Sequence, residues 1–342
     1  MTTRKSRILW IDYLKTFACI LVVIGHLLQS FQKAGIDPYV SVTSFINWFI
    51  YLFHMPLFIA ISGYLYFKGK QPQNYIDYKK FALKKVINLL VPYFVFYLLF
   101  IGINIVFSQS VNNPMGLNEL IGIINNPIAP YWYLYALVSI FIFIPLLEKI
   151  CNNNEKIICT ILFLLKLLSF IIKTQIYIID SIMNFGIYFY IGKFIANKEN
   201  NKVDNTIQTI GNLILYIIFA LVYSYNQVNI YFIGEVIRFI FAVLGIIVFV
   251  KIFRNVNKSK FLDTIKEYTF QIYLLHTIFA AGIRIILLKL GIDNYFIHFT
   301  VGFIFSLYIP VIISIVSNKI KYTNIFFYPI KTIEELKGSK IK

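Results

Sequence analysis

The stretch DYLKTFACILVVIGH, residues 12–26, resembles a membrane-spanning helix in composition, yet it carries three ionisable side chains. Charged groups at membrane depth are costly unless they face other protein segments or water. Asp12, Lys15 and His26 are therefore expected to lie on one side of a helix, turned toward neighbouring helices and away from lipid.

Helical geometry supports this arrangement. At about 100° per residue, the steps from Lys15 to His26 bring the two side chains within about 20° of the same direction. Asp12 lies three residues before Lys15 and Cys19 four after it, so the same stripe holds all four. Along the axis, however, Lys15 and His26 are about 16 Å apart. Asp12 is therefore the expected partner of Lys15, and His26 is expected near the other end of the helix.

The rest of the chain is equally apolar. Of its 342 residues, 59% are hydrophobic and 14% are charged, against about 25% charged in soluble domains. Apolar runs long enough to cross a bilayer recur throughout. We expect an all-α, polytopic helical bundle forming a single membrane domain over residues 1–342. The ten expected spans are residues 8–30, 44–67, 84–107, 131–149, 156–173, 176–196, 208–226, 230–251, 267–289 and 294–318.

The chain has a net charge of +17, and its basic residues are distributed as this topology predicts. With the N-terminus in the cytoplasm, 25 of the 32 Lys and Arg residues fall in inside segments and only Lys33, Lys173 and Lys289 fall in outside connections. This asymmetry is the positive-inside rule. It predicts cytoplasmic termini and a basic cytoplasmic tail at 319–342. We expect a multi-pass protein of a cell membrane, with a bacterial plasma membrane as its location. It also argues against nucleic acid as the partner, and the first span lacks the cleavage site of a signal peptide.

The three cysteines do not suggest a metal site. Cys19, Cys151 and Cys159 lack the spacing of a disulfide framework or of metal ligands, and each lies in or beside a span. They are expected to be packing residues. No internal repeat is apparent, which weakens the interpretation of the chain as a symmetric transporter.

His26 leaves two interpretations open. A histidine titrates at about pH 6.5 and can act as a general base at neutral pH. A histidine near a helix end can equally bond a neighbouring carbonyl and have only a structural role. The sequence of this helix alone favours neither the catalytic nor the structural interpretation.

The second span and the connection after it contain two further features. In FHMPLFIAISGYLYFKGK, residues 53–70, Pro56 is expected to kink the helix and the Ser62–Gly63 pair to permit close helix packing. A basic connection follows, with Lys79, Lys80, Lys84 and Lys85. It is ordinary positive-inside charge, or it holds the phosphates of an anionic cofactor.

Polar and aromatic residues recur toward the expected outer half of several spans. Trp132 lies among tyrosines in PYWYLYALVSIF, residues 130–141, which is typical of an interfacial aromatic belt, although aromatic faces also stack on sugars. Glu235 and Arg238 can pair on one helical face. His276 lies near mid-depth and Arg284 nearer the outside. The pattern predicts a polar cavity that opens outward.

Four segments together resemble the acyltransferase type 3 family of ten-helix membrane enzymes. RILWIDYLKTFACILVVIGH (7–26) is similar to its opening segment, in which a basic residue, ten others and a histidine correspond to Lys15 and His26. FHMPLFIAISGYLYF (53–67) resembles its Pro-x-Phe and Ser-Gly-Tyr signature. YWYLYAL (131–137) and TFQIYLLHTIF (269–279) resemble its aromatic and Tyr-Leu-x-His segments. One departure is clear: the family often has two arginines three apart before Pro-Tyr, where this chain has Lys85 and Asn88.

The resemblance implies transfer of an acyl group, most often acetyl, from cytoplasmic acyl-CoA to a hydroxyl of an extracytoplasmic surface glycan. It implies that His26 is the catalytic base, without a metal. Asp12, Lys15, Ser62, Trp132 and His276 are then supporting residues. The CoA phosphates would meet Lys79, Lys80, Lys84 and Lys85, and Glu235, Arg238 and Arg284 are candidates for binding the acceptor. The acyl group would move on an extended pantetheine arm or through an acyl-histidine.

Several alternatives stay open. A transporter or flippase of a polysaccharide or lipid-linked sugar fits ten helices with polar groups at depth equally well, and a structural subunit of a synthase complex is a third interpretation. Membrane lipid, glycan-synthesis proteins and a second copy of the chain are the other partners considered. The sequence leaves the glycan, the hydroxyl position and the choice between acetyl and succinyl open.

Overall fold

The computed structural model describes residues 8–198, 206–225, 231–320 and 322–339, and within these ranges it contains helices and no strand. The long helices are α1 (Leu9–Lys33), α2 (Val40–Phe67), α3 (Tyr75–Val106), α5 (Trp132–Ile150), α6 (Glu155–Leu168), α7 (Tyr177–Asn197), α8 (Thr206–Tyr225), α9 (Tyr231–Arg254), α11 (Thr269–Lys289) and α12 (Tyr295–Lys319). The short helices are α4 (Asn118–Ile121), α10 (Lys260–Ile265), η2 (Thr323–Phe326) and α13 (Pro329–Ser339). The expected all-α bundle is confirmed.

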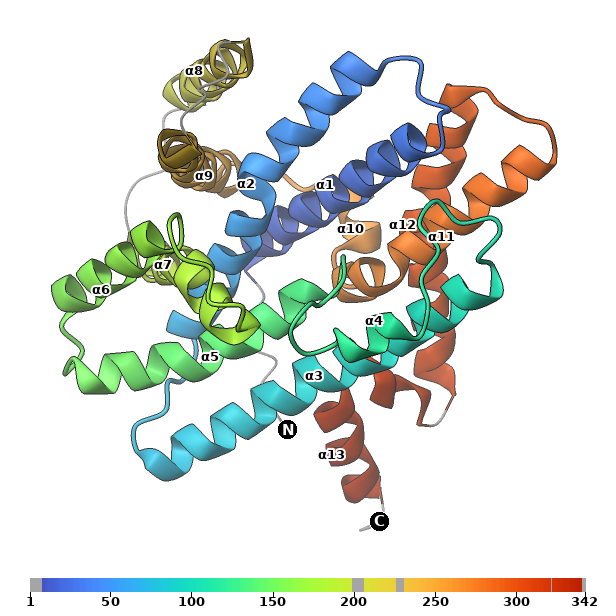
Figure 1. Cartoon of the computed structure of the whole chain (residues 1–342). Coiled ribbons are helices and arrows are strands. Elements are labelled where there is room, and N and C mark those ends of the chain that lie inside the picture. Colours follow the sequence, from blue (N-terminus) through green and yellow to red (C-terminus); the bar gives the residue numbers. More distant parts are fainter. Residues whose placement is uncertain (1–7, 199–205, 226–230, 321, 340–342) are drawn as a thin grey trace.

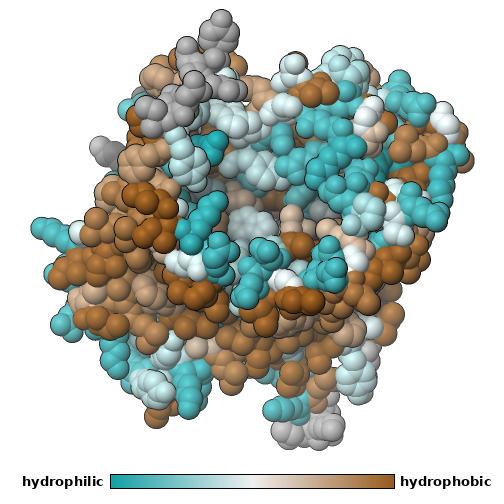
Figure 2. Space-filling view, in the orientation of Figure 1, coloured by the Kyte–Doolittle hydropathy of each residue, from teal (hydrophilic) through white to brown (hydrophobic). Residues whose placement is uncertain are grey.

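Nine of the described helices are long and apolar enough to cross a membrane, namely all the long ones except α6. Figure 2 shows a broad hydrophobic band across the lower part of one face, with hydrophilic residues above and below it. This is the surface expected of a protein surrounded by lipid. The chain is a multi-pass membrane protein.

Helix α6 has only 14 residues, or about 21 Å, yet the chain crosses the bundle there. Helices α5 and α7 run parallel, because both their starts and their ends meet. At the start of each, the Tyr177 hydroxyl donates to the Trp132 carbonyl at 3.2 Å. At the other end, Lys193 lies 3.4 Å from Glu148. The chain must therefore return from the end of α5 to the start of α7, and α6 with the residues after it makes that return.

Helix α1 lies in the middle of the bundle. It packs against α2, α9, α11 and α12, with α8 at the far edge beside α9 (Figure 1). The residues that α1 buries recur at helical spacing and include Leu14, Ala18, Val22 and Leu27. The central position of α1 explains how this helix accommodates polar residues, because its polar stripe meets other helices.

The close packing of α2 on α7 depends on glycine. A Cβ at Gly63 would lie 1.9 Å from the Phe189 carbonyl oxygen, and one at Gly192 would lie 2.2 Å from the Tyr64 amide nitrogen. The two backbones approach so closely that no side chain fits between them. The packing role expected for Ser62–Gly63 is therefore confirmed, and α2 continues as a helix through Pro56.

The basic connection is helical, because α3 begins at Tyr75, before the expected span at 84–107, and includes Lys79, Lys80, Lys84 and Lys85. Asn74 caps the helix: its side-chain oxygen accepts from the Asp77 amide at 2.9 Å. Such a cap satisfies a backbone donor that the first helical turn would leave unpaired. The polar composition of these residues concealed more than two additional turns of helix before residue 84.

Candidate functional site

A polar cavity of about 340 Å³ lies between α1, α3, α11 and the segment that joins α3 to α5. We call it the histidine cavity. It is lined by His26, Gln29, Ser30, Lys33, Phe100, Asn104, Val111, Asn112, Asn113, Met115, Ile128, Ala129, Thr277, Ala280, Ala281 and Arg284. The expected polar cavity is therefore present, and it brings together His26 and Arg284.

His26 meets a second histidine in this region. The centroids of the His26 and His276 rings are 5.2 Å apart. His276 is fully buried, and its Nδ1 lies 2.9 Å from the carbonyl oxygens of both Ile272 and Tyr273. A nitrogen between two acceptors must carry the proton, so His276 has the Nδ1–H tautomer. Its Nε2 is then an acceptor, and it has no hydrogen-bond partner among the described residues.

His26 itself is half-buried and stays available for chemistry. In contrast to His54, His276 and His298, which each bond a backbone carbonyl, its ring forms no hydrogen bond within the part of the chain that the structure describes. The purely structural interpretation, in which a neighbouring carbonyl holds the ring, therefore has no support from these contacts. An imidazole beside a polar cavity can accept a proton from a bound hydroxyl group.

Arg284 places a buried cation on the wall of the same cavity. Its side chain is 2% exposed, and its Nη1 donates to the Ser30 hydroxyl at 2.7 Å and to the Ser30 carbonyl at 3.3 Å. No carboxylate of a described residue lies within 4.0 Å, and its Nε has no partner there. A buried guanidinium without a counter-ion is costly. The cavity is thus suited to an oxygen-rich or anionic ligand.

Two tyrosines hold α11 against the start of α5, and a third joins α5 to α2. The Tyr131 hydroxyl donates to the Leu274 carbonyl at 3.0 Å, and the Tyr273 hydroxyl donates to the Pro130 carbonyl. Tyr133 shares a 3.0 Å hydrogen bond with Ser62 on α2. These bonds fix the turn of α11 that carries His276. Ser62 therefore supports the site indirectly, through α5.

The aromatic-belt interpretation of residues 130–141 is wrong for these tyrosines. Tyr131, Tyr133 and Tyr135 are all less than 10% exposed, whereas belt residues face the lipid headgroups. Their hydroxyl groups find partners inside the bundle, which permits burial. Sequence composition alone could not separate the two cases, because both produce clustered aromatic residues near a helix end.

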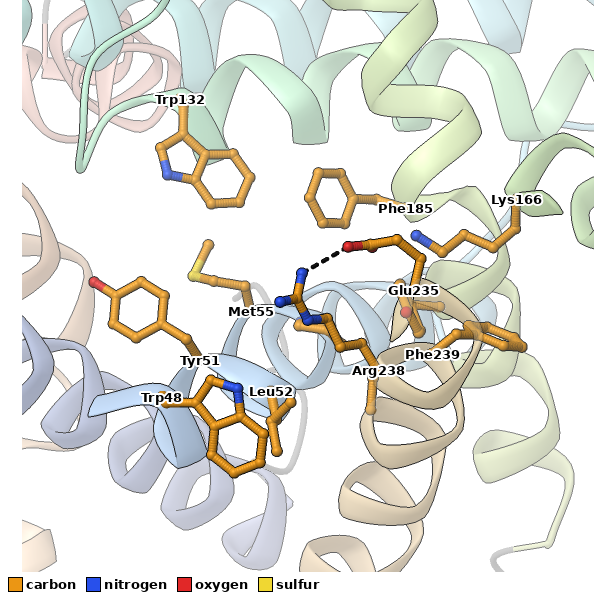
Figure 3. Close-up of a pocket in the computed structure, with 13 residues that line it drawn as sticks. Trp48, Tyr51, Leu52, Met55, Trp132, Lys166, Phe185, Glu235, Arg238 and Phe239 are labelled. Atoms are coloured by element: carbon orange, nitrogen blue, oxygen red, sulfur yellow. Dashed lines mark hydrogen bonds and ion pairs between the residues drawn. The ribbon is translucent and has the colours of Figure 1, made fainter. Parts of the chain in front are cut away.

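Trp132 lines a second cavity of about 350 Å³, which we call the aromatic cavity (Figure 3). Its walls come from α2, α5, α6, α7 and α9. They comprise Trp48, Tyr51, Leu52, Met55, Pro56, Trp132, Lys166, Phe185, Tyr188, Glu235, Arg238, Phe239 and Ala242. The expected pair between Glu235 and Arg238 forms here, at 2.6 Å. These two residues therefore lie apart from Arg284, in a different cavity.

Asp12 and Lys15 form the expected ion pair, at 3.5 Å, near the start of α1. They do not line the histidine cavity. The same end of α1 is fixed to α10, because the Tyr13 hydroxyl donates to Asp263 at 2.8 Å. The two ends of the polar stripe thus have different surroundings, as the helical spacing predicts.

The four lysines expected to hold an anionic cofactor line neither cavity. Lys84 pairs with Glu334 of α13 at 3.2 Å, and Lys85 lies 3.8 Å from the centroid of the Phe141 ring. Lys79 and Lys80 are exposed on the first turns of α3. Asn88, where the family often has arginine, accepts from the Ile330 amide at the start of α13 at 3.3 Å.

Sequence reasoning missed several residues at the site. Tyr51 lines the aromatic cavity and lies against His54, with ring centroids 4.6 Å apart. Asn104 lies on α3 and lines the histidine cavity, where its Oδ1 has no hydrogen-bond partner among the residues that the structure describes. The polar character of Asn104 inside an apolar span was the available signal for it. No local signal marks Tyr51, because an aromatic residue near a helix end is common.

Comparisons with known proteins agree with this architecture. A family model described as an acyltransferase domain matches residues 8–315. The nodulation protein NolL of Mesorhizobium japonicum is 48% identical over 61 residues, which are 18% of this chain and 16% of that protein. NolL of Sinorhizobium fredii is 42% identical over 66 residues, with the same coverage. The chain thus spans about one sixth of the length of these relatives. No solved structure matches. The family match covers nearly the whole bundle, and the chain belongs to the acyltransferase type 3 family.

Proposed function

We propose that this membrane acyltransferase transfers an acyl group, acetyl in the simplest case, from cytoplasmic acyl-CoA to a hydroxyl of an extracytoplasmic glycan. The observation that carries the proposal is His26: its ring has no hydrogen-bond partner among the described residues, and it faces a polar cavity beside His276. A base in a cavity near one end of the bundle suits an acceptor that enters from that side.

In the proposed reaction, an acceptor hydroxyl binds in the histidine cavity and attacks the carbonyl carbon of the thioester. His26 removes the hydroxyl proton during the attack. The new ester C–O bond forms, the C–S bond breaks, and the thiolate of CoA takes up the proton from His26. The enzyme returns to its starting state, and atoms and charge balance.

Two neighbours would support His26. The His276 ring centroid lies 5.2 Å from that of His26, and the unprotonated Nε2 of His276 has no partner among the described residues, so a water or hydroxyl that contacts both rings would find an acceptor on each. Arg284 would bind oxygen atoms of the acceptor, because its guanidinium has no carboxylate partner among the described residues. We propose His276 as a positioning residue and Arg284 as a binding residue.

The donor would approach from the opposite end of α1. With the expected topology, Asp12 and Lys15 lie on the cytoplasmic side, and Lys15 is about 16 Å below His26. Acyl-CoA with its pantetheine arm extended covers that distance, so the thioester can reach His26 without a covalent intermediate. Lys15, held by Asp12, is the proposed contact for the donor at the mouth of this path.

The test uses purified protein, radiolabelled acetyl-CoA and surface glycan isolated from cells that lack the gene. We expect label in the glycan with the wild type and a loss of about 10²-fold or more with His26→Ala. His298→Gln is the control, because His298 is a buried histidine that lies outside the histidine cavity and bonds a backbone carbonyl, which His26 does not. No transfer from any acyl-CoA, together with glycan movement across vesicles, would support the flippase instead.

A further inference from the structure

The aromatic cavity carries side chains that the proposed acyl transfer does not use. Six aromatic residues surround it, with Trp132 stacked on Phe185 at a centroid distance of 5.4 Å. Figure 3 shows aromatic and charged side chains converging on the space between α2, α5 and α9. Flat aromatic faces fit the C–H faces of sugar rings, and the charged groups can bond hydroxyls.

The charges in this cavity do not cancel. Glu235 and Arg238 neutralise each other at 2.6 Å. Lys166 is 7% exposed. Its Nζ donates to the Asn184 side-chain oxygen at 3.4 Å and lies 4.9 and 5.6 Å from the centroids of the Phe170 and Tyr188 rings. Within the described residues no carboxylate lies within 4.0 Å of that amine. Figure 3 shows the amine pointing into the cavity. A buried ammonium without a counter-ion is costly, and an anionic ligand would offset that cost.

The residues that line the histidine cavity likewise carry a net positive charge. Lys33 and Arg284 line it, and none of its lining residues is acidic. Under the positive-inside rule, basic residues are scarce toward the outer side, so their presence there needs a specific reason. Outside the inside segments, the chain has seven basic residues: Lys15, Lys33, Lys166, Lys173, Arg238, Arg284 and Lys289. Four of them line the two cavities.

The two cavities are neighbours. Tyr51 lines the aromatic cavity, and its Cε2 lies 2.9 Å from where a Cβ of Gly25 would be, one residue before His26. On the other side, Ile128 and Ala129 line the histidine cavity, and Trp132 of the next turn lines the aromatic one. Figure 2 shows a hollow near the middle of this face with hydrophilic residues around its rim. An extended ligand can therefore reach both cavities.

We propose that the aromatic cavity binds a second sugar residue of the acceptor, and that this residue carries a carboxylate or phosphate that pairs with Lys166. The acceptor is then an anionic oligosaccharide or polysaccharide that spans both cavities, with the acylated hydroxyl at His26. The inference rests on the proposed function for the acylation step, but binding at the aromatic cavity can be measured without it.

The first experiment asks which glycans become labelled. Surface glycan from cells lacking the gene is separated on an anion exchanger into a retained and an unretained pool, and each is incubated with purified protein and radiolabelled acetyl-CoA. We expect label in the retained pool. Equal labelling of the unretained pool would overturn the proposal.

The second experiment measures the contribution of Lys166. Lys166→Gln should raise KM for the retained pool at least tenfold and leave kcat unchanged, and Lys166→Arg should recover most of the loss. Lys173→Gln is the control, because Lys173 is an exposed lysine after α6 that lines neither cavity. An unchanged KM in Lys166→Gln, with transfer intact, would refute this inference and leave the proposed function standing.

Binding without turnover separates the two proposals. Two of the three tryptophans, Trp48 and Trp132, line the aromatic cavity, so their fluorescence reports its occupancy. We expect the retained pool to change that fluorescence in wild type and in His26→Ala, and more weakly in Lys166→Gln. If this holds while no variant transfers acetyl, the binding site is supported and the acyl-transfer proposal fails. No fluorescence change with either pool would overturn the binding site.

Discussion

The imidazole rings of His26 on α1 and His276 on α11 lie with their centroids 5.2 Å apart at the edge of a polar cavity. The two residues come from opposite ends of the chain, and parallel packing of α1 and α11 brings them together. Ser30 and Arg284 meet further along the same two helices at 2.7 Å. The pair is thus part of a continuous polar seam between α1 and α11.

Replacing His276 tests whether this pair acts in catalysis. His276→Ala should lower kcat for glycan acylation by about tenfold to 10²-fold and leave the KM for acyl-CoA unchanged, because the lost group positions the base and does not bind the donor. The measurement is steady-state kinetics with a pH profile, whose acidic limb should move as the environment of His26 changes. Comparison with His276→Gln, which fills more of the volume of histidine than alanine does, separates the loss of the imidazole from the loss of side-chain volume. A normal pH profile in both variants would mean that His276 is only structural.

Gly63→Ala should destabilise the bundle. The added Cβ would lie 1.9 Å from the Phe189 carbonyl oxygen, so α2 and α7 must separate. Overpacking of this kind costs about 1–3 kcal/mol. Thermal unfolding of detergent-solubilised protein would measure the effect.

Gly102→Ala on α3 is the matched control, because a Cβ there meets nothing within 4 Å. This variant should keep the stability of the wild type or gain slightly from the higher helix propensity of alanine. Equal stability of the two variants would contradict the close contact between α2 and α7.

Much of the fold could be predicted because lipid imposes simple rules on sequence. Apolar length identified the helices, and the spacing of Asp12, Lys15 and His26 predicted both the Asp12–Lys15 pair and the separation of His26 from it. Helix α3 extends beyond the expected span at 84–107, because its first turns, around Lys79 and Lys80, are polar and exposed. Composition identifies the membrane-crossing part of a helix, and the cap at Asn74 decides where the helix begins.

The site was harder to predict than the fold. His26, His276 and Arg284 were each recognisable as costly polar residues within spans. Which of them share a cavity depends on how the helices pack against one another. The spacing of residues along a single helix does not predict that packing. Glu235 and Arg238 illustrate this: their mutual pairing followed from their spacing, but their position beside Trp132 and Lys166 depends on how α9 packs against α6 and α7.

The contact between Tyr13 and α10 should make stability depend on pH. Hydrogen bonds from Lys266 and from the Tyr13 hydroxyl hold the pKa of the Asp263 carboxyl below its ordinary value of 3.8. The folded state therefore binds the Asp263 proton more weakly than the unfolded state does. The stabilisation is complete well above pH 3.8 and is lost as pH falls from there through the lower pKa of the folded state.

Asp263→Asn should remove this pH dependence. Its melting temperature should be slightly below that of the wild type near neutral pH, and the difference should shrink as pH is lowered through the acidic range. Thermal unfolding at several pH values is the measurement, with Asp293→Asn as the control, since Asp293 lies in the exposed turn before α12. A difference that stays constant with pH would show that the Asp263 charge does not contribute to stability.

Arg284→Gln should weaken the acceptor's interaction with the histidine cavity while leaving the donor unaffected. The guanidinium is anchored by the Ser30 hydroxyl at 2.7 Å, and its Nε has no partner among the described residues. Loss of one charged hydrogen bond to the glycan corresponds to about 1.5–3 kcal/mol, or a rise in KM for the glycan of at least tenfold. Ser30→Ala removes the anchor but keeps the cation, so its effect on KM should be smaller and in the same direction. Kinetics with glycan and acetyl-CoA varied separately would measure both. If the KM for acetyl-CoA rose instead, Arg284 would have to be assigned to binding of the donor and not of the acceptor.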